Sequence, residues 1–490
     1  MVSAGRPVLG DTGEMRTLSV VVLGAGPAGL AVALALGRDG HRVTLVERDP
    51  VVVDEPSAAS SWQRGGIPHF HQPHAFIPRG RLDMREAFPD VFRTLIDNGA
   101  WDLDVRSKIR GPSRPEDHEL TYLAARRPLI EWALRRAVSL EPAIRVMSGV
   151  DATGYEGTHG DMPLVTGVVT STGSIKADLV VDAMGRRTQG ASWIGSLGGR
   201  PVVERRSDCG IIYYSRYYRV RDGQRLPDGP WLLGPRADLG YGAFTTFPGD
   251  NGAFAASLGI RPGDQELKSL KHAAAFDAAV ATMPALHAWT NADTAEPITD
   301  VLPMGSLQNT LRMPDGEMPG ALGLIGVGDA VCHTDPALAL GLAFSLSHAR
   351  LLATVLRDHA GDPDDLGRAF LAAAGPEMEE RFAYVSAIDE ARSKSWAGES
   401  VDIAHRDGGA YALFTLAAGS AAAMVDGDIF RAVVRRNAFL DPLAVLDDDV
   451  AMQQRIEGIF GDLMRQGRPR PGPGRDDLIA VVHEAISRVD

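Results

Sequence analysis

The stretch Leu18–Pro50 constrains the fold more than any other part of the chain. It begins with a short apolar run rich in β-branched residues, Val20–Leu23, which predicts a buried parallel strand. Three glycines follow with the spacing G-x-G-x-x-G, at Gly24, Gly26 and Gly29. An apolar helical pattern comes next, and then a second apolar strand, Val43–Val46, which ends at Glu47. This order of strand, tight turn, helix and strand predicts a βαβ nucleotide-binding unit.

Each glycine has its own role in such a turn. Gly24 permits the tight turn, Gly26 lets the backbone approach a pyrophosphate, and Gly29 lets the helix pack close to the strand. The helix N-terminus faces the phosphate charge, and an acid placed like Glu47 can bond a ribose 2′-OH. We therefore expect a dinucleotide site. The alternative is a tight βα turn that binds nothing.

Length, charge and cysteine content indicate a large enzyme of the reducing cytoplasm. With 490 residues the chain can form more than one domain. Its net charge of −13 argues against nucleic acid or an anionic membrane as partner. The two cysteines, Cys209 and Cys332, form no CxxC pair and imply no disulfide framework. No apolar run approaches the roughly 20 residues of a membrane span.

Patterning along the chain predicts a discontinuous first domain. Two β-rich runs flank the turn Thr172-Gly173, and Leu179–Ala183 forms a third. From Trp193 to about Pro297 the sequence changes to alternating and aromatic strands with little helix, including a hairpin formed by Gly242–Phe247 and Phe254–Ile260. We expect an antiparallel sheet inserted between two nucleotide-binding segments.

Other segments predict loops and helices. Trp62–His74 contains two prolines and a Gly-Gly pair and should form an ordered loop. Pro89 should split Arg81–Ala100 into two helices. Further expected elements are a helix at Arg127–Leu140, a strand at Ile144–Val150, a long apolar helix from about Leu342 to Val355, a helical region that starts at Gly375-Pro376, a linker at Arg468–Gly474 and a helix at Asp476–Val489.

A third motif, in the Ala321–Asp329 run, makes the assignment more specific. This apolar run ends in Gly328-Asp329, and Ala330, Pro336 and Gly341 follow. Together with the first glycine motif and a middle motif at Met184-Gly185, it resembles the para-hydroxybenzoate hydroxylase-type superfamily of FAD-dependent monooxygenases. The likeness is greatest to actinobacterial members that oxidise natural products and to polyether epoxidases.

The resemblance implies an α/β fold: a Rossmann-like FAD-binding domain, an inserted antiparallel β-sheet substrate domain and a helical C-terminal region. The expected boundaries are a flexible tail at 1–17, an FAD-binding domain at 18–192 and 298–372, a substrate domain at 193–297 and a helical region at 373–490. The FAD-binding residues that it implies are Gly24, Gly26, Pro27, Ala28, Gly29, Glu47, Arg48, Arg64, Arg127, Val150, Gly328, Asp329, Pro336, Gly341 and Leu342.

Some of these implied roles are more specific than others. Glu47 is expected at the adenosine ribose with Arg48 beside it, and Asp329 at the ribityl chain. The helix that begins near Gly341 would direct its N-terminus at the flavin pyrimidine edge. Arg64 and Arg127 match flavin-contacting positions more loosely, and for each a surface arginine is the alternative.

The chain departs from the family pattern at two places. The middle motif is usually Asp-Gly, but here Met184-Gly185 precedes Arg186-Arg187. We therefore predict that NADH or NADPH acts only as a transient donor, or that a separate flavin reductase or ferredoxin-type protein supplies the electrons. After Pro336, Ala339 and Ala343 stand where the family often has Gly and Asn.

The remaining candidates concern metal and substrate. His69, His71 and His74 lie in a proline-broken loop without acidic or cysteine neighbours, so we expect no metal. Alternation along Ile211–Val220 places Tyr214, Arg216 and Tyr218 on one face and Tyr213, Ser215 and Tyr217 on the other. We predict that the first three line a substrate pocket; an ordinary core strand is the alternative. The sequence identifies no catalytic side chain.

The predicted activity is hydroxylation or epoxidation of a hydrophobic small molecule with O₂, in natural-product biosynthesis. The flavin carries such chemistry, which fits the absence of an evident catalytic set. Two alternatives stay open. One is an FAD-dependent reductase or dehydrogenase of the geranylgeranyl reductase type, and the other is a flavin-binding redox sensor, against which the extended β-insert argues.

Overall fold

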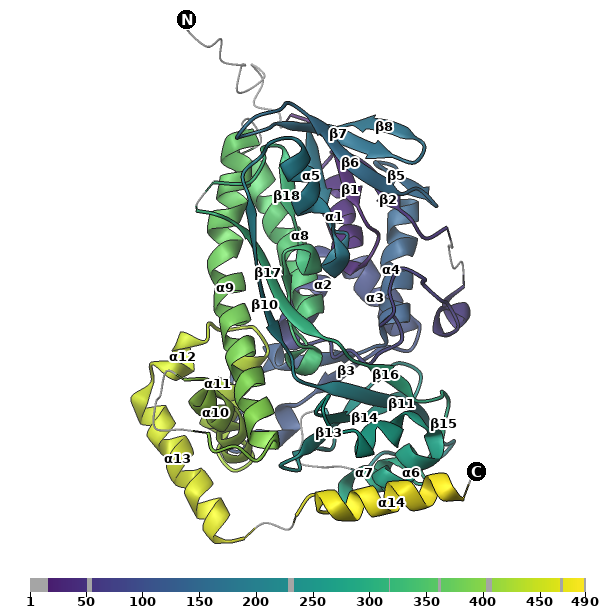
Figure 1. The fold of residues 1–490 in the computed structure, drawn as a ribbon, viewed down its shortest axis with the longest axis vertical. Coiled ribbons are helices and arrows are strands. Elements are labelled where there is room, and N and C mark those ends of the chain that lie inside the picture. Colours follow the sequence, from purple (N-terminus) through teal and green to yellow (C-terminus); the bar gives the residue numbers. More distant parts are fainter. Residues whose placement is uncertain are drawn as a thin grey trace, which may run out of the picture.

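The structure is a computed structural model that describes residues 16–50, 55–227, 233–316, 318–359, 363–401, 408–467 and 470–488. Most of the predicted N-terminal tail and two residues of the predicted linker lie outside these ranges. A parallel sheet with its helices forms one end of the molecule, a second sheet the other end, and two long helices run beside the first (Figure 1).

The parallel sheet contains the βαβ unit expected from the sequence. Its strands are β1 (Ser19–Leu23), β2 (Arg42–Glu47), β5 (Ile144–Ser148), β9 (Leu179–Asp182) and β18 (Leu324–Gly326), in the order β18-β9-β1-β2-β5. Helix α1 (Pro27–Arg38) connects β1 to β2. The sheet brings together strands from both predicted segments of the discontinuous domain, because β18 pairs with β9.

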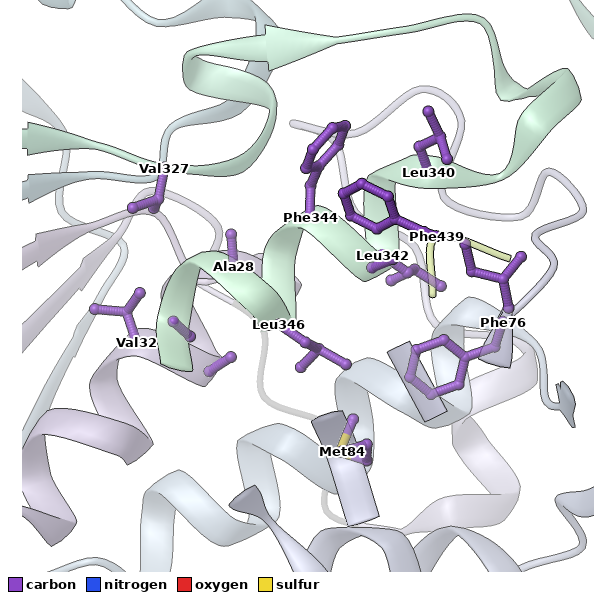
Figure 2. Packing of buried hydrophobic residues seen from close by; sticks show 14 of the residues in the cluster. Ala28, Val32, Phe76, Met84, Val327, Leu340, Leu342, Phe344, Leu346 and Phe439 are labelled. Atoms are coloured by element: carbon purple, nitrogen blue, oxygen red, sulfur yellow. The ribbon is translucent and has the colours of Figure 1, made fainter. Parts of the chain in front are cut away.

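Helices cover this sheet through one continuous apolar core. They are α2 (Pro78–Ala87), α3 (Pro89–Asp97), α4 (Arg127–Leu140) and α8 (Leu340–His359), and Pro89 separates α2 from α3 as predicted. Figure 2 shows α8 inserting Phe344 and Leu346 among side chains of α1, α2 and the C-terminal region. Leu342 also lies in this core, so its side chain does not face the expected flavin site.

Smaller strands and helices flank the parallel sheet. They are β3 (Trp101–Asp104), β4 (Thr121–Ala124), α5 (Gly190–Ser196) and a three-stranded antiparallel sheet of β6 (Ala152–Gly157), β7 (Val165–Thr170) and β8 (Gly173–Lys176). The β7–β8 turn is at Thr172-Gly173, where the sequence placed it.

The inserted sheet is antiparallel, as expected, but it extends beyond residue 297. It consists of β11 (Ile212–Val220), β12 (Arg236–Asp238), β13 (Gly242–Pro248), β14 (Ala253–Ile260) and β15 (Ala295–Pro297), with β16 (Leu302–Met304) also paired to β11. A second group joins β10 (Val202–Asp208), β17 (Gln308–Pro314) and β19 (Cys332–His333). The predicted boundary therefore cuts through paired strands.

The prediction of little helix in this insert is wrong. Helices α6 (Ala273–Ala281) and α7 (Pro284–Thr290) cover one face of the six-stranded sheet. The final helix α14 (Arg475–Ser487) packs beside α6, as Figure 1 shows, and places Leu478 and Val482 in the same core. The C-terminus thus completes the core of the inserted sheet.

The C-terminal region is helical, as predicted, but it begins earlier than Gly375-Pro376. Helix α9 (Pro363–Trp396) runs through Pro376, which removes only one backbone donor while the helix packs against α8, α10 and β17. It is followed by α10 (Gly409–Ala423), α11 (Gly427–Asn437), α12 (Ala444–Asp447) and α13 (Val450–Arg465). Across the described ranges, no helix combines the length and apolarity needed to cross a membrane.

Candidate cofactor and substrate site

All three motifs lie at the carboxyl ends of the parallel strands. The first motif follows β1, Glu47 ends β2, Val150 follows β5, the middle motif follows β9 and Gly328-Asp329 follows β18. Because the strands are parallel and adjacent, these segments meet at one edge of the sheet. This edge is where open α/β sheets bind their ligands.

The glycines of the first motif have the geometry that their spacing predicts. Gly24 has a φ of +93°, and a Cβ there would lie 2.6 Å from the carbonyl oxygen of Ala183. A Cβ on Gly29 would lie 1.8 Å from the carbonyl oxygen of Gly24. A Cβ on Gly26 would meet nothing within 4 Å. Packing requires glycine at Gly24 and Gly29, whereas Gly26 leaves the helix N-terminus open to a ligand.

The third motif packs directly on the first. Gly328 has a φ of +57°, and a Cβ there would lie 3.0 Å from the Cβ of Ala28. The Gly328 N–H donates to Nδ1 of His348 on α8 at 3.1 Å. Burial lowers the pKa of His348 to about 4, so the ring is neutral and accepts this bond. The contact between Ala28 and Gly328 thereby joins motifs about 300 residues apart.

Asp329 is the acidic group of this edge that is open to a ligand. Its side chain is half-buried, and Oδ1 lies 3.7 Å from the position of a Cβ on Gly341. It therefore faces the first turn of α8. No hydrogen bond to the Asp329 carboxylate comes from the part of the chain that the structure describes.

The loop before α8 explains one departure from the family pattern. Pro336–Leu338 forms a 3-10 turn capped by Asp335, whose carboxylate accepts from the Ala337 N–H at 3.0 Å. The next residue, Ala339, has a φ of +56°, in the left-handed region that favours glycine. The family's glycine suits this backbone, and here alanine adopts it at a cost of about 1 kcal/mol.

A buried cluster of charges lies beneath the glycine turn, and we call it the Glu131 cluster. Its members are Glu47, Asp49, Arg64, Arg127, Glu131 and Arg135. Arg64 contacts Glu47 and Glu131, each at 2.6 Å, and donates to the Ala25 carbonyl at 3.1 Å. Arg127 donates to Glu131 at 2.7 Å. Both arginines are buried, so the surface-arginine alternative is wrong for each.

The Glu131 carboxylate stays ionised because arginines surround it. Burial alone would raise the pKa of Glu131, but Arg127, Arg64 and Arg135 together hold that pKa below its ordinary value. Glu47 accepts from the Ala25 N–H at 2.7 Å and from Asp49 N–H at 2.9 Å. The sequence analysis missed Glu131, although its position four residues after Arg127 on a helix was a usable signal.

Two more of the expected FAD-binding residues, Arg48 and Val150, lie beside Glu47. Arg48 is exposed and donates to the Gly66 carbonyl at 3.1 Å. Val150 is buried, and its N–H donates to the Glu47 carbonyl at 3.1 Å.

The structure corrects the predicted substrate face of the tyrosine strand. Tyr214 and Tyr218 are buried in the core beneath α6, α7 and α14. The Tyr218 hydroxyl donates to Asp277 of α6 at 3.1 Å, and Arg216 donates to the same carboxylate at 2.5 Å. These side chains do not line a pocket. Alternation defined two faces correctly, but only the unforeseen helices decide which face is core.

The opposite face of β11 points toward the nucleotide-binding domain. Tyr213 donates from its hydroxyl to Asp335 Oδ1 at 2.7 Å, next to the Pro336–Leu338 turn. A small cavity of about 10 Å³ lies between this sheet and the first domain, and it is lined by His74, Ala75, Phe76, Leu103, Tyr122, Leu123, Ala124, Leu233, Phe247 and Pro248. Its volume is that of about one water molecule.

The histidine loop is held by its own backbone. His71 bonds the Trp62 carbonyl at 2.7 Å, and His74 bonds the Gln72 carbonyl at 2.7 Å. Burial, with Arg127 nearby, lowers the pKa of His69 to about 2. Among the described residues, the group of side chains that could hold a metal ion is Cys209, Asp335 and Asp389. It contains none of the three histidines. Arg392 already lies 2.8 Å from both of these carboxylates and occupies the place of a cation.

Comparisons with known proteins agree with this geometry. Residues 19–191 match the family described as FAD dependent oxidoreductase. Protein Rv3254 of Mycobacterium tuberculosis is 26% identical over 69% of this chain and 72% of its own length. The FAD-dependent monooxygenase notI' of Aspergillus versicolor is 24% identical over 47% of this chain and 49% of its own length.

Solved structures share the fold at low sequence identity. PqsL from Pseudomonas aeruginosa, a probable FAD-dependent monooxygenase, superposes with a TM-score of 0.56 and 14% identity, over 78% of this chain and 99% of that one. OxyS anhydrotetracycline hydroxylase from Streptomyces rimosus gives a TM-score of 0.53 and 18% identity, over 87% of this chain and 76% of that one. Residues 19–191 therefore match the FAD dependent oxidoreductase family, and the chain shares the fold of these two solved structures.

Proposed function

We propose that this protein binds FAD at the carboxyl edge of its parallel sheet and inserts an oxygen atom from O₂ into a hydrophobic small molecule. The observation that carries the proposal is the meeting of three motifs at that edge, opposite an antiparallel sheet with aromatic side chains on its near face. A nucleotide site alone would serve many reactions. The facing sheet supplies a place for a substrate.

The residues at the edge fit the parts of FAD. The open backbone at Gly26 and the N-terminus of α1 suit the pyrophosphate, with Arg64 and Arg127 as nearby cations. Glu47, Arg48 and Val150 would surround the adenosine, since they lie at the ends of β2 and β5. Asp329 would bond the ribityl chain, and Pro336 and Gly341 would border the ring.

When bound, the flavin supplies the redox chemistry and the reaction with O₂. The chain positions it and excludes water. The N-terminus of α8 would stabilise negative charge on the pyrimidine edge. Arg186 adds positive charge nearby, because it is half-buried beside Asp329. Its pKa is lowered mainly by burial and, to a smaller extent, by repulsion from Arg187. The sequence analysis quoted Arg186 without assigning it a role.

The substrate is a hydrophobic small molecule, and a role in natural-product biosynthesis agrees with the name of OxyS anhydrotetracycline hydroxylase. The electrons come from NADH or NADPH acting transiently, or from a separate reductase.

Two measurements test the proposal. Heat extraction of the purified protein, followed by mass analysis, should release FAD and no NAD. Reduced enzyme mixed with ¹⁸O₂ and candidate polycyclic or phenolic substrates should give product that carries the label. A protein that cannot be reconstituted with FAD would contradict the cofactor assignment. Conversion of a substrate without label incorporation would instead support the reductase alternative.

A further inference from the structure

One buried residue, Asp335, joins the turn before α8 to three other parts of the fold. Its side chain is 0% exposed, whereas the turn Pro336–Leu338 that follows it is partly open, with Ala337 exposed. Gly341, in the first turn of α8, is exposed as well. A fully buried anchor thus comes directly before a segment that a ligand can reach. None of the sequence motifs accounts for this anchor.

The carboxylate of Asp335 ties the turn to the inserted sheet and to the C-terminal region. Its Oδ1 accepts from the Tyr213 hydroxyl of β11 at 2.7 Å and from the Ala337 N–H at 3.0 Å. Its Oδ2 accepts from Arg392 of α9 at 2.8 Å. The same guanidinium nitrogen donates to the Cys209 carbonyl, just before β11, at 2.7 Å. Arg392 is also buried, so water does not compete for these bonds and the carboxylate keeps one orientation.

The backbone of Asp335 is held separately, by Asn309 of β17. The Asp335 N–H donates to Asn309 Oδ1 at 2.6 Å. The amide nitrogen of Asn309 donates in turn to Asp389 of α9 at 2.8 Å and to Ser207 of β10 at 3.2 Å. An amide group has a single acceptor oxygen, so these donor bonds decide that Oδ1 points at Asp335. Asn309 is fully buried and neutral, and it therefore fixes the anchor without adding charge.

The turn needs such support because its backbone is strained. Ala339 has a φ of +56°, in the region that favours glycine. A residue other than glycine keeps such a conformation only where the surrounding structure imposes it. Here the turn is fixed on one side by Asp335 and on the other by Leu340 and Leu342, which are buried in the core. Weakening the anchor would therefore let the turn relax to another shape.

We propose that Asn309 and Arg392 are positioning residues for the isoalloxazine ring of FAD. They hold Asp335, and Asp335 holds the turn and the N-terminus of α8 where the ring would bind. The position of the ring rests on the proposed function, in which Pro336 and Gly341 border it. The ADP half of FAD would lie at the glycine turn after β1, at a different strand end. The anchor thus acts on one half of the cofactor and not on the other.

Binding of FAD and of ADP to the apoprotein separates these two halves. Asn309→Ala removes the acceptor of the Asp335 N–H without changing the charge of the site. The Kd for FAD should rise at least several-fold, because the turn is no longer held in the shape that fits the ring. The Kd for ADP should stay as in the wild type, because ADP lacks the ring. The visible circular dichroism of bound FAD should also change, since it reports how the ring is held.

Asn291→Ala is the matched control for this variant. Asn291 directly follows α7, and its Oδ1 also accepts from backbone N–H groups, those of Asp293 and Thr294, each at 3.1 Å. The loop that it holds carries no residue that is expected to bind FAD. Both Kd values and the visible circular dichroism of bound FAD should therefore be the same in Asn291→Ala as in the wild type.

A milder second variant decides the test if Asn309→Ala does not fold. Tyr213→Phe removes one donor to Asp335 and should raise the Kd for FAD by a smaller factor, with the Kd for ADP unchanged. Tyr218→Phe, on the same strand, removes a bond to Asp277 beneath α6 and should change neither Kd. Far-ultraviolet circular dichroism and melting curves establish which variants are folded.

Two results would overturn the proposal. One is an equal rise in the Kd for FAD and for ADP, which would make the anchor a general support of the fold. The other is an unchanged Kd for FAD in folded Asn309→Ala, or in Tyr213→Phe where only that variant folds. A protein that shows the expected difference between FAD and ADP but incorporates no label from ¹⁸O₂ would support the positioning role and contradict only the proposed oxygenation.

Discussion

Asp329 is the side chain in the candidate flavin site whose replacement gives the clearest result. It faces the start of α8, and no described residue hydrogen-bonds its carboxylate. Asp329→Ala should leave a cofactor hydroxyl unpaired at about 1–3 kcal/mol, so the Kd for FAD should rise roughly tenfold. Equilibrium titration of the apoprotein with FAD measures this change. Asp161→Ala, in an exposed loop, is the control, and an unchanged Kd in folded Asp329→Ala would assign Asp329 a structural role.

Replacing Ala339 by glycine should not destabilise the protein, whereas a glycine substitution usually does. Because its φ is +56°, glycine relieves roughly 1 kcal/mol of backbone strain, which offsets the entropy that glycine adds to the unfolded chain. Ala339→Gly should therefore keep or slightly raise the free energy of unfolding. Ala343→Gly, four residues on in buried α8, should lower it by about 1 kcal/mol or more. Chemical denaturation of both variants makes the comparison, and equal losses would contradict it.

Individual residues were predictable where backbone geometry alone selects them. Gly24 and Gly29 follow from steric limits that no other residue meets, so spacing was sufficient evidence. Tyr213 and Tyr214 are neighbours with the same chemistry, and alternation separates their faces without saying which face is covered. Asp389 was out of reach, because its partner Asn309 lies 80 positions earlier in the sequence and on another element.

Helix α4 carries the next prediction, through Glu131. Glu131→Gln removes a buried acceptor from Arg64 and Arg127, which should destabilise the apoprotein by roughly 3–5 kcal/mol. Pyrophosphate oxygens would supply the lost negative charge, so the rise in Tm on adding FAD should be larger in Glu131→Gln than in the wild type.

The opposite end of α4 provides the control for this measurement. Glu141, which follows α4, makes a partly exposed contact with Arg38 at 3.8 Å. Glu141→Gln should change Tm little and should leave the FAD-induced shift as in the wild type. An FAD-induced shift in Glu131→Gln no larger than that of the wild type would place the pyrophosphate away from the Glu131 cluster.

Helix α9 introduces a pH dependence through Asp389. The folded state keeps the proton of this acid up to about pH 8, whereas the unfolded chain loses it near its ordinary value. The folded state thus binds more protons in this window, and this contribution to stability falls as the pH rises. The Asp389→Asn variant has no carboxyl group at this position and therefore lacks this contribution. The free energy of unfolding of the wild type relative to Asp389→Asn should therefore decrease from about pH 5 to about pH 8. Urea denaturation across this range tests it, and a constant difference would mean that Asp389 is ionised.

Elements were predictable where local signals decide them and not where distant packing does. Periodicity and proline identified α2, α3 and the β13–β14 hairpin from their own residues. Helix α9 runs through Pro376 because contacts with α8, α10 and β17 stabilise it. The domain boundary at 297 was wrong because β16 and β17 pair with strands that lie far earlier in the chain.

The molecule as a whole joins its two sheets through long-range connections. Helix α9 contacts β10, β17 and β18, and α14 returns to the core beneath the inserted sheet. A substrate bound between the two sheets would therefore lie between parts that are tied together on several sides. Such an arrangement would protect a reactive cofactor from water.

The source of electrons follows from this arrangement. In the described part of the chain one sheet is parallel and the others are antiparallel, so a single glycine-rich nucleotide unit serves the flavin. A nicotinamide must then bind transiently at the flavin face, where Met184-Gly185 replaces the usual Asp-Gly. We expect NADH and NADPH to reduce the flavin slowly and a separate flavin reductase or ferredoxin-type donor to accelerate the reaction. Anaerobic bleaching of the flavin band, with and without substrate, measures each rate, and dithionite-reduced enzyme is the control for the later reaction with O₂. Rapid bleaching by either nicotinamide alone would contradict the need for a partner and leave the oxygenation proposal intact, because the source of the electrons does not decide how the reduced flavin reacts with O₂.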